Sequence, residues 1–187
     1  MKFLIVGLGN IGDEYTNTRH NIGFKIAEAL ATKHKADFSS QRHAFVSEFK
    51  IKNKNLVLIK PTTFMNLSGN AVRYWMQKEK ISIENIMIIV DDLALPFGSI
   101  RMKGTGSDGG HNGLKSVQKL LLTQNYSRLR FGIAGDFAKG KQADYVLDNW
   151  SKEELKTLDE RILKSVNAIE TFCLAGLSTA MTEFNKS

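Results

Sequence analysis

The chain has 187 residues, 42% of them hydrophobic, and a formal net charge of +7. This length allows one well-cored domain and is short for two, while the hydrophobic content excludes a disordered chain. No apolar run approaches the ~18 residues of a membrane span, and we expect no secretory signal. The single Cys173 has no partner for an intrachain disulfide, which favours a reducing cytoplasm, and its apolar neighbours suggest a small buried hydrophobe.

The positive charge is concentrated in one part of the chain. Residues 99–142 contain eight basic residues and two acids, a net +6 of the total +7. Such a segment predicts a basic face and a polyanionic partner. A solvated surface that only aids solubility would carry the same charge, so charge alone leaves both interpretations open.

The first segment begins with a short β-prone run at residues 3–6, which is followed by a loop rich in glycine and polar residues. Gly7 to Gly12 fits the dinucleotide pattern G-x-G-x-x-G. Two acids, Asp13 and Glu14, then stand where phosphates would lie, and the next helix is predicted to begin only near His20 or Asn21. A nucleotide-dependent oxidoreductase is therefore a weak alternative.

The second segment predicts an antiparallel hairpin followed by a helix. Residues 44–51 alternate in hydrophobicity and residues 56–59 form a tighter apolar run, with a polar turn between them. Asn66 or Ser68 is a candidate N-cap for a helix over residues 71–80.

The third segment is predicted to contain the central strand. Residues 86–90 are the most apolar run and indicate a strand buried on both faces, which Asp91 and Asp92 are expected to end. A strand at residues 99–103, a glycine-rich loop at 104–113 and a helix at about 114–122 should follow.

The last segment predicts one more strand and two helices. Residues 128–134 alternate as a strand, Ser151 and Glu154 form a capping box for a helix that ends near Leu174, and a short helix follows Gly176. The order of elements indicates a single α/β domain over residues 1–187, with a mixed, mostly parallel central sheet and helices on both faces.

Polar side chains follow several of the predicted strands. Asn10 and His20 come after the first, Asn66 after the hairpin, Asp91 after the central strand, and residues 111–112 precede a helix. Because an open α/β sheet gathers its ligands at the carboxyl ends of its strands, one shared site is the simplest hypothesis.

Six segments carry a more specific signal when they are taken together. They are Gly7-Leu-Gly-Asn10, Tyr15 through Asn21, Lys60 through Gly69, Asp91 through Pro96, Gly109-Gly-His-Asn-Gly113 and Arg128-Leu-Arg-Phe-Gly132. In this order they resemble the bacterial peptidyl-tRNA hydrolase family, and the similarity covers most of the chain. This family cleaves the ester that joins a peptidyl group to the 3′-terminal ribose of tRNA.

The resemblance implies a role for each matching residue. It makes His20 the general base, Asp91 its orienting partner and Asn10 a third catalytic residue of the cleft. The expected substrate-binding residues are Tyr15, Phe64, Asn66, His111 and Asn112, with Lys103 and Arg130 at the terminal phosphate of the tRNA. The resemblance implies no metal and no cofactor, peptidyl-tRNA as the partner, no membrane association and a monomer. One departure is Ala94, which stands where relatives often have an acid.

The chemistry of the residues agrees with ester hydrolysis. A histidine near neutral pKa suits the activation of water, and a carboxylate on its other ring nitrogen fixes the tautomer. No G-x-S-x-G motif is present, and the histidines and the cysteine lack metal-ligand spacing. A non-catalytic RNA-binding module is the main alternative, in which Asn10 and Asn66 would be turn or cap residues and His111 would serve local hydrogen bonding.

Overall fold

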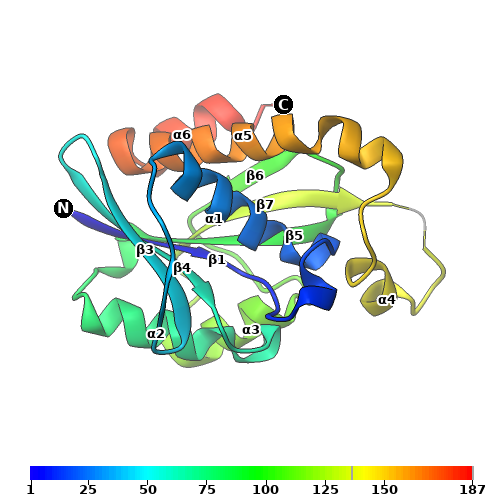
Figure 1. Ribbon diagram of the computed structural model, residues 1–187, viewed down its shortest axis with the longest axis horizontal. Helices are drawn as coiled ribbons and strands as arrows, with labels where there is room; N and C mark the ends of the chain where they lie inside the picture. Colours follow the sequence, from blue (N-terminus) through cyan, green and yellow to red (C-terminus); the bar gives the residue numbers. More distant parts are fainter. Residues whose placement is uncertain (136, 187) are drawn as a thin grey trace.

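The computed structural model describes residues 1–135 and 137–186, and within them seven strands form one sheet in the order β2-β3-β4-β1-β5-β7-β6 (Figure 1). The strands are β1 (Lys2–Gly7), β2 (Ser39–Gln41), β3 (Ala44–Ile51), β4 (Lys54–Pro61), β5 (Ile86–Pro96), β6 (Ile100–Lys103) and β7 (Ser127–Ala134). The α-helices are α1 (Ile22–Lys33), α2 (Ser68–Lys78), α3 (Asn112–Leu121), α4 (Gln142–Val146), α5 (Lys152–Ala175) and α6 (Leu177–Phe184). Single 3-10 turns are η1 (Asp13–Tyr15), η2 (Arg19–Asn21), η3 (Met65–Leu67) and η4 (Ile83–Asn85).

The centre of the sheet is parallel and its flanks are antiparallel. β1 lies between β4 and β5 and runs parallel to both, and β5 also runs parallel to β7. The pairs β2–β3, β3–β4 and β6–β7 are antiparallel. The predicted α/β class with a mixed, mostly parallel central sheet is therefore confirmed.

Helices cover both faces of the sheet, as predicted. Figure 1 shows α1, α5 and α6 on one face and α2 and α3 on the other. The core therefore has two layers: the first lies between the sheet and α1, α5 and α6, and the second between the sheet and α2 and α3. Because successive strand residues point to opposite sides, Phe3 and Ile5 of β1 pack in the first layer, while Leu4 and Val6 pack in the second. Cys173 lies in the first layer, where burial raises the pKa of its thiol to about 12. It is a buried hydrophobe, as its neighbours in the sequence suggested.

The prediction that Asp91 and Asp92 end the central strand is wrong. β5 continues to Pro96, and its pairing with β7 shifts register between Asp92 and Pro96. Gly132 of β7 permits this, since a Cβ there would lie 1.9 Å from the carbonyl oxygen of Pro96. Such irregularities bend a strand and change the direction of nearby side chains, and this one follows directly after the two aspartates.

The predicted caps of the second helix are also wrong. α2 begins at Ser68, and its N-cap is Leu67, which makes no side-chain cap hydrogen bond. The preceding turn η3 leads directly into the helix, so the chain is already helical where a cap was expected. The sequence also gave no indication of β2 or α4, because each is a single short element.

The glycines at the end of β1 and just after it allow close packing of α1 on the sheet. A Cβ on Gly7 would lie 2.2 Å from the carbonyl oxygen of Gly23, and a Cβ on Gly9 would lie 2.7 Å from the ring of Phe24. α1 starts at Ile22, well beyond Gly12. Without a helix N-terminus at the glycines, the loop lacks the phosphate cradle of a dinucleotide fold.

None of the helices in the described residues is both long enough and apolar enough to cross a membrane.

Candidate active site

A cleft of about 980 Å³ lies at the carboxyl ends of the central strands. The segments that follow β1 and β4 and the end of β5 all contribute to its wall. Since these three strands are parallel neighbours, their ends meet at one edge of the sheet. Nine of the ten residues predicted for the site line this cleft: Asn10, His20, Phe64, Asn66, Asp91, Lys103, His111, Asn112 and Arg130.

His20 and Asp91 form the centre of the cleft. His20 lies in the turn η2, and its Nδ1 is 2.9 Å from both carboxylate oxygens of the buried Asp91. An ionised carboxylate can only accept hydrogen bonds, so Nδ1 carries the proton and donates a hydrogen bond to Asp91. The other ring nitrogen, Nε2, is left with its lone pair on a residue that lines the cleft.

His111 contacts the same carboxylate from the opposite wall. Its Nε2 lies 2.9 Å from Oδ1 of Asp91, and its Nδ1 accepts the backbone N–H groups of Gly113 and Leu114 at the start of α3. A backbone amide can only donate, so Nδ1 is unprotonated and Nε2 carries the proton. His111 is therefore neutral, and it both caps α3 and donates to Asp91.

Burial and charge act in opposite directions on this group. Burial favours the neutral form of Asp91, but His20 and His111 outweigh it and hold the pKa of Asp91 well below its usual range. Burial also disfavours a charged His20, but the charge and hydrogen bond of Asp91 outweigh it and raise the pKa of His20 above 6.5. Asp91 therefore stabilises the protonated form of His20 relative to a histidine in water.

Asn10 is held with its amide in one orientation. Its Oδ1 accepts the backbone N–H of Met65 at 2.8 Å, so the Nδ2 group is the donor that remains for a ligand. The backbone of Asn10 is held in turn by Asn21, whose side chain bonds both its N–H and its carbonyl at 2.9 Å. Asn21 comes directly after His20 in η2, so one turn positions both the histidine and the asparagine.

Two further asparagines and one aromatic ring lie at the mouth of the cleft. Asn66 in η3 and Asn112 at the start of α3 are exposed, and within the described residues neither side chain has a hydrogen-bond partner. Phe64 is 54% exposed although it is large and apolar. Amide donors beside an exposed ring match the mixed polar and apolar surface of a peptide.

The basic end of the cleft has three cations on one face of the sheet. Lys103 of β6 pairs opposite Arg128 of β7, and Arg130 lies two residues further along β7. Residues that are directly or diagonally opposite in this way share a face. Arg130 donates from its Nε to Asp92.

Arg128 was not predicted, because a buried arginine is rare and its alternation with apolar residues fitted any strand. It is 1% exposed and donates to the backbone carbonyls of Ser107 and Gln124. No ion pair of Arg128 is present among residues 1–135 and 137–186. Its guanidinium lies 4.4 Å from the centre of the Tyr126 ring, and its bond to Ser107 holds the glycine-rich loop that precedes His111.

Comparison with known proteins agrees with this arrangement. The family described as peptidyl-tRNA hydrolase matches residues 4–187. The chain is 56% identical to the peptidyl-tRNA hydrolase of Phocaeicola vulgatus, with both chains covered completely, and 50% identical to that of Porphyromonas gingivalis, over 99% of this chain and 100% of the other. The chain belongs to the peptidyl-tRNA hydrolase family. The structure is also similar to a crystal structure of peptidyl-tRNA hydrolase from Acinetobacter baumannii, with a TM-score of 0.93 and 33% identity over 98% of this chain and 94% of that one.

Membership of the peptidyl-tRNA hydrolase family makes the chain a hydrolase with peptidyl-tRNA as its substrate class. Ala94 lines the cleft and donates its backbone N–H to Asp92. Asp92 is itself paired with Arg130. Asp91 is therefore the carboxylate that serves the histidines.

One predicted residue lies outside the cleft of this peptidyl-tRNA hydrolase family member, and one wall was missed. Tyr15 is in η1 and is not among the lining residues; its backbone carbonyl accepts from Thr18. The missed wall is α4, where Ala143 and Val146 line the cleft together with the preceding Phe137. An apolar residue every third position over one helical turn is too weak a signal to identify such a wall.

His20, Asp91 and His111 also have the residue types of a metal site, and their ligand atoms lie within 4.8 Å of one another. A metal needs a lone pair on the nitrogen it binds. Nε2 of His111 has none, because the cap of α3 uses the lone pair of Nδ1 and places the proton on Nε2. The hydrogen bonds therefore favour a carboxylate that orients two histidines over a metal centre.

Proposed function

We propose that the protein hydrolyses the ester between the peptidyl group and the 3′-terminal ribose of tRNA with His20 as the general base. The observation that carries this proposal is the hydrogen bond of His20 Nδ1 to Asp91, which leaves Nε2 as an acceptor in the cleft. In this role Nε2 takes a proton from a water molecule, whose oxygen attacks the ester carbonyl. The imidazolium that forms is stabilised by the buried Asp91.

The remaining steps follow from the polar groups around the histidine. The amide groups of Asn10, Asn66 and Asn112 are available donors for the oxyanion, the peptide backbone and the attacking water. The imidazolium then returns its proton to the 3′-oxygen of the ribose as the carbon–oxygen bond breaks. His111 holds Asp91 from the other side and keeps its carboxylate in place during both steps. We assign no role to a metal or a cofactor.

The basic end of the cleft is proposed to hold the tRNA. Lys103 and Arg130 would bind the terminal phosphate, which carries more charge than an internal phosphate and occurs only at a strand end. Arg130 donates to Asp92 through Nε, which leaves the edge between its two Nη groups as a second fork that can bind an anion. The side chain of Phe64 would contact the peptide.

We further propose that the protein acts in the cytoplasm, where translation supplies peptidyl-tRNA, and that it acts as a monomer.

The test is release of peptide from a purified peptidyl-tRNA. We expect cleavage by the protein alone, and also in the presence of a chelator, with free tRNA as the second product. A non-catalytic RNA-binding protein would bind the substrate and leave the ester intact. Cleavage that stops with the chelator would overturn the metal-independent mechanism.

A further inference from the structure

Arg19, which directly precedes His20, is buried and makes contacts that the mechanism above does not use. The residue is 6% exposed although it carries a charge. Its Nε and Nη2 donate to the two carboxylate oxygens of Glu154, at 3.1 and 2.8 Å. This is the fork geometry that only arginine provides, and it joins residues that are 135 positions apart in the sequence.

Glu154 is fixed by a second set of hydrogen bonds. Glu154 is the third residue of α5, and its backbone N–H donates to Oγ of Ser151. The backbone N–H of Ser151 donates in return to the Glu154 carboxylate at 2.6 Å. Burial favours a neutral Glu154, but the hydrogen bonds from Arg19 and Ser151 outweigh it and hold the pKa of Glu154 below its usual range. The carboxylate that anchors Arg19 is thus charged and fixed in position.

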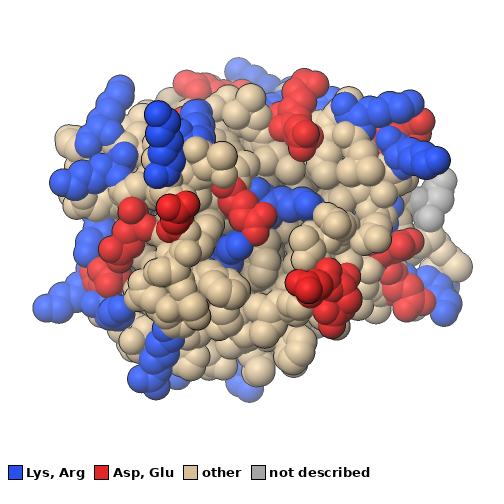
Figure 2. All heavy atoms as spheres, in the orientation of Figure 1, with Lys and Arg blue, Asp and Glu red and all other residues tan. Residues whose placement is uncertain are grey.

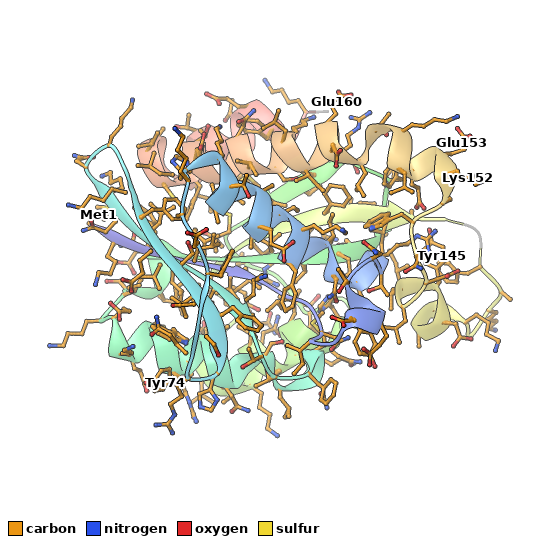
Figure 3. The ribbon with its side chains drawn as sticks, in the orientation of Figure 1. Met1, Tyr74, Tyr145, Lys152, Glu153 and Glu160 are labelled. Carbon is orange, nitrogen blue, oxygen red and sulfur yellow. The ribbon has the colours of Figure 1, made fainter. Side chains whose placement is uncertain are left out.

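The guanidinium also contacts α4, which packs beside the turn η2 that carries the histidine. Nη1 donates to the backbone carbonyl of Tyr145 at 3.3 Å, and Cζ lies 4.3 Å from the centre of the Tyr145 ring. Figure 3 places Tyr145 on α4, beside the turns that follow β1. Its neighbour Val146 lines the cleft. The backbone of Arg19 also binds the segment that follows α4, because its N–H donates to the carbonyl of Asp148.

We propose that Arg19 is a positioning residue which, through Glu154 and Tyr145, fixes His20 against Asp91 and sets the distance from His20 to the α4 wall. The inference rests on the proposed function, since it assigns Arg19 to the same reaction. The turn η2 is a single 3-10 turn and contains only Arg19, His20 and Asn21. A turn this short cannot hold a side chain by its own hydrogen bonds. The residues on either side of His20 therefore anchor the turn. Arg19 binds α4 and α5, and Asn21 binds the backbone of Asn10.

The test compares Arg19→Lys with the wild type. Lysine keeps the charge but cannot contact Glu154 through a fork and Tyr145 at the same time. We expect kcat to fall about 10- to 100-fold, the loss typical of ~1 Å misplacement in an active site. KM for peptidyl-tRNA should change little, because the residue touches no substrate group. The double variant Arg19→Lys/Glu154→Gln should lose no more kcat than the more damaging of the two single variants, because both act through the same contact.

A pH profile separates positioning from simple loosening of the fold. The titratable groups that face His20 are Asp91 on β5 and His111 before α3. If His20 moves away from Asp91, burial still disfavours its charged form while the opposing attraction weakens. The acid limb of kcat/KM, and the titration of His20 followed by NMR, should then shift to lower pH in Arg19→Lys.

Two variants on α5 are the controls. Glu170→Gln breaks a pair of the same helix with Lys33, on a surface away from the cleft, and should leave kcat and the acid limb unchanged. Ala168→Gly loosens the buried interior of α5 without touching Glu154, and it should lower the Tm without shifting the limb. Should Arg19→Lys not fold, Glu154→Gln carries the test through its kcat and KM.

A folded Arg19→Lys protein with wild-type kcat and an unchanged His20 titration would overturn the positioning role. An equal shift of the limb in Ala168→Gly would do the same, because loosening of α5 alone would then explain it. A wild-type protein that does not cleave peptidyl-tRNA would instead remove the proposed function. In that case the NMR titration of His20 still decides whether Arg19 positions it.

Discussion

Nδ1 of His20 lies 2.9 Å from each of the two carboxylate oxygens of Asp91, in the interior of the cleft. This contact fixes the tautomer of the imidazole, so the nitrogen with the lone pair is the one that remains for a substrate water. The orientation of a base relative to its proton matters as much as its pKa. Four testable consequences concern this site and its substrate, and one concerns the helix that follows it.

The first prediction is that His20→Ala lowers kcat by about 10²–10⁴-fold, the usual contribution of a positioned general base. The affinity for tRNA should be nearly unchanged, because Lys103 and Arg130 remain in place. Single-turnover cleavage and binding of uncharged tRNA give the two values. A variant that keeps wild-type turnover would remove His20 from the mechanism.

The second prediction concerns pH. The pKa of His20 is raised above 6.5 by Asp91 against the effect of burial, and the base must be neutral to act. Activity should therefore fall as the pH drops through this raised pKa. In Asp91→Asn the attraction is lost while burial remains, so the acid limb of kcat/KM should move to lower pH. The rate should fall less than in His20→Ala, since an amide oxygen in the position of Oδ1 can still accept from both histidines. A limb that stays in place would show that Asp91 does not control the base.

The third prediction separates the two roles of His111. Asparagine is a good N-cap and alanine a poor one, and their difference is typically about 1 kcal/mol. His111→Asn should therefore be more stable than His111→Ala by about this amount in denaturant unfolding. Both variants lose the donor to Asp91, so both should show a similar reduction of kcat. Wild-type kcat in His111→Asn would mean that the cap is the only role of His111.

The sequence located most of the site because the site follows the strand ends. Asn10, Asn66 and Asp91 come after neighbouring strands that are parallel, and the carboxyl ends of such strands share one edge. His20 and His111 required the family resemblance, since a histidine in a loop is usually a surface residue. The exact extent of β5 was missed because two acids normally indicate the end of a buried strand, whereas here one of them is paired with Arg130.

The contacts that the sequence did not show are pairs of charges far apart in the chain. Arg19 and Glu154 each look like ordinary surface residues in their own segments, and only the fold brings them together. The pairing of Arg130 with Asp92 could not be predicted for the same reason. Figure 2 shows basic and acidic side chains intermixed on the face that it presents. Local patterns specify elements and strand ends, but they do not specify such partners.

The fourth prediction tests the packing of α1 on the strands. A Cβ on Gly23 would lie 2.4 Å from the carbonyl oxygen of Leu8 and 2.8 Å from that of Ile89. Alanine favours a helix over glycine by about 1 kcal/mol, but overpacking against backbone typically costs about 1–3 kcal/mol. Gly23→Ala should therefore destabilise the protein in denaturant unfolding. A stabilised variant would show that α1 can move away from the sheet.

The last prediction concerns how the basic end of the cleft distinguishes a tRNA end from the middle of an RNA. Lys103 is exposed, and within the described residues it has no ion pair, whereas Arg130 is held through Nε by Asp92. We expect Lys103→Ala and Arg130→Ala to lower kcat/KM for full peptidyl-tRNA and to spare a minimal ester that has no tRNA body. Each variant should also flatten the log–log salt dependence of tRNA binding by about 0.7–0.9, the value for one lost phosphate contact. Lys2→Ala is the matched control, because Lys2 pairs with Glu79 at the start of β1, the end of that strand away from the cleft. Its salt dependence should equal that of the wild type. Equal losses on both substrates would mean that Lys103 and Arg130 support the fold or the catalytic groups, and the phosphate site would have to be abandoned.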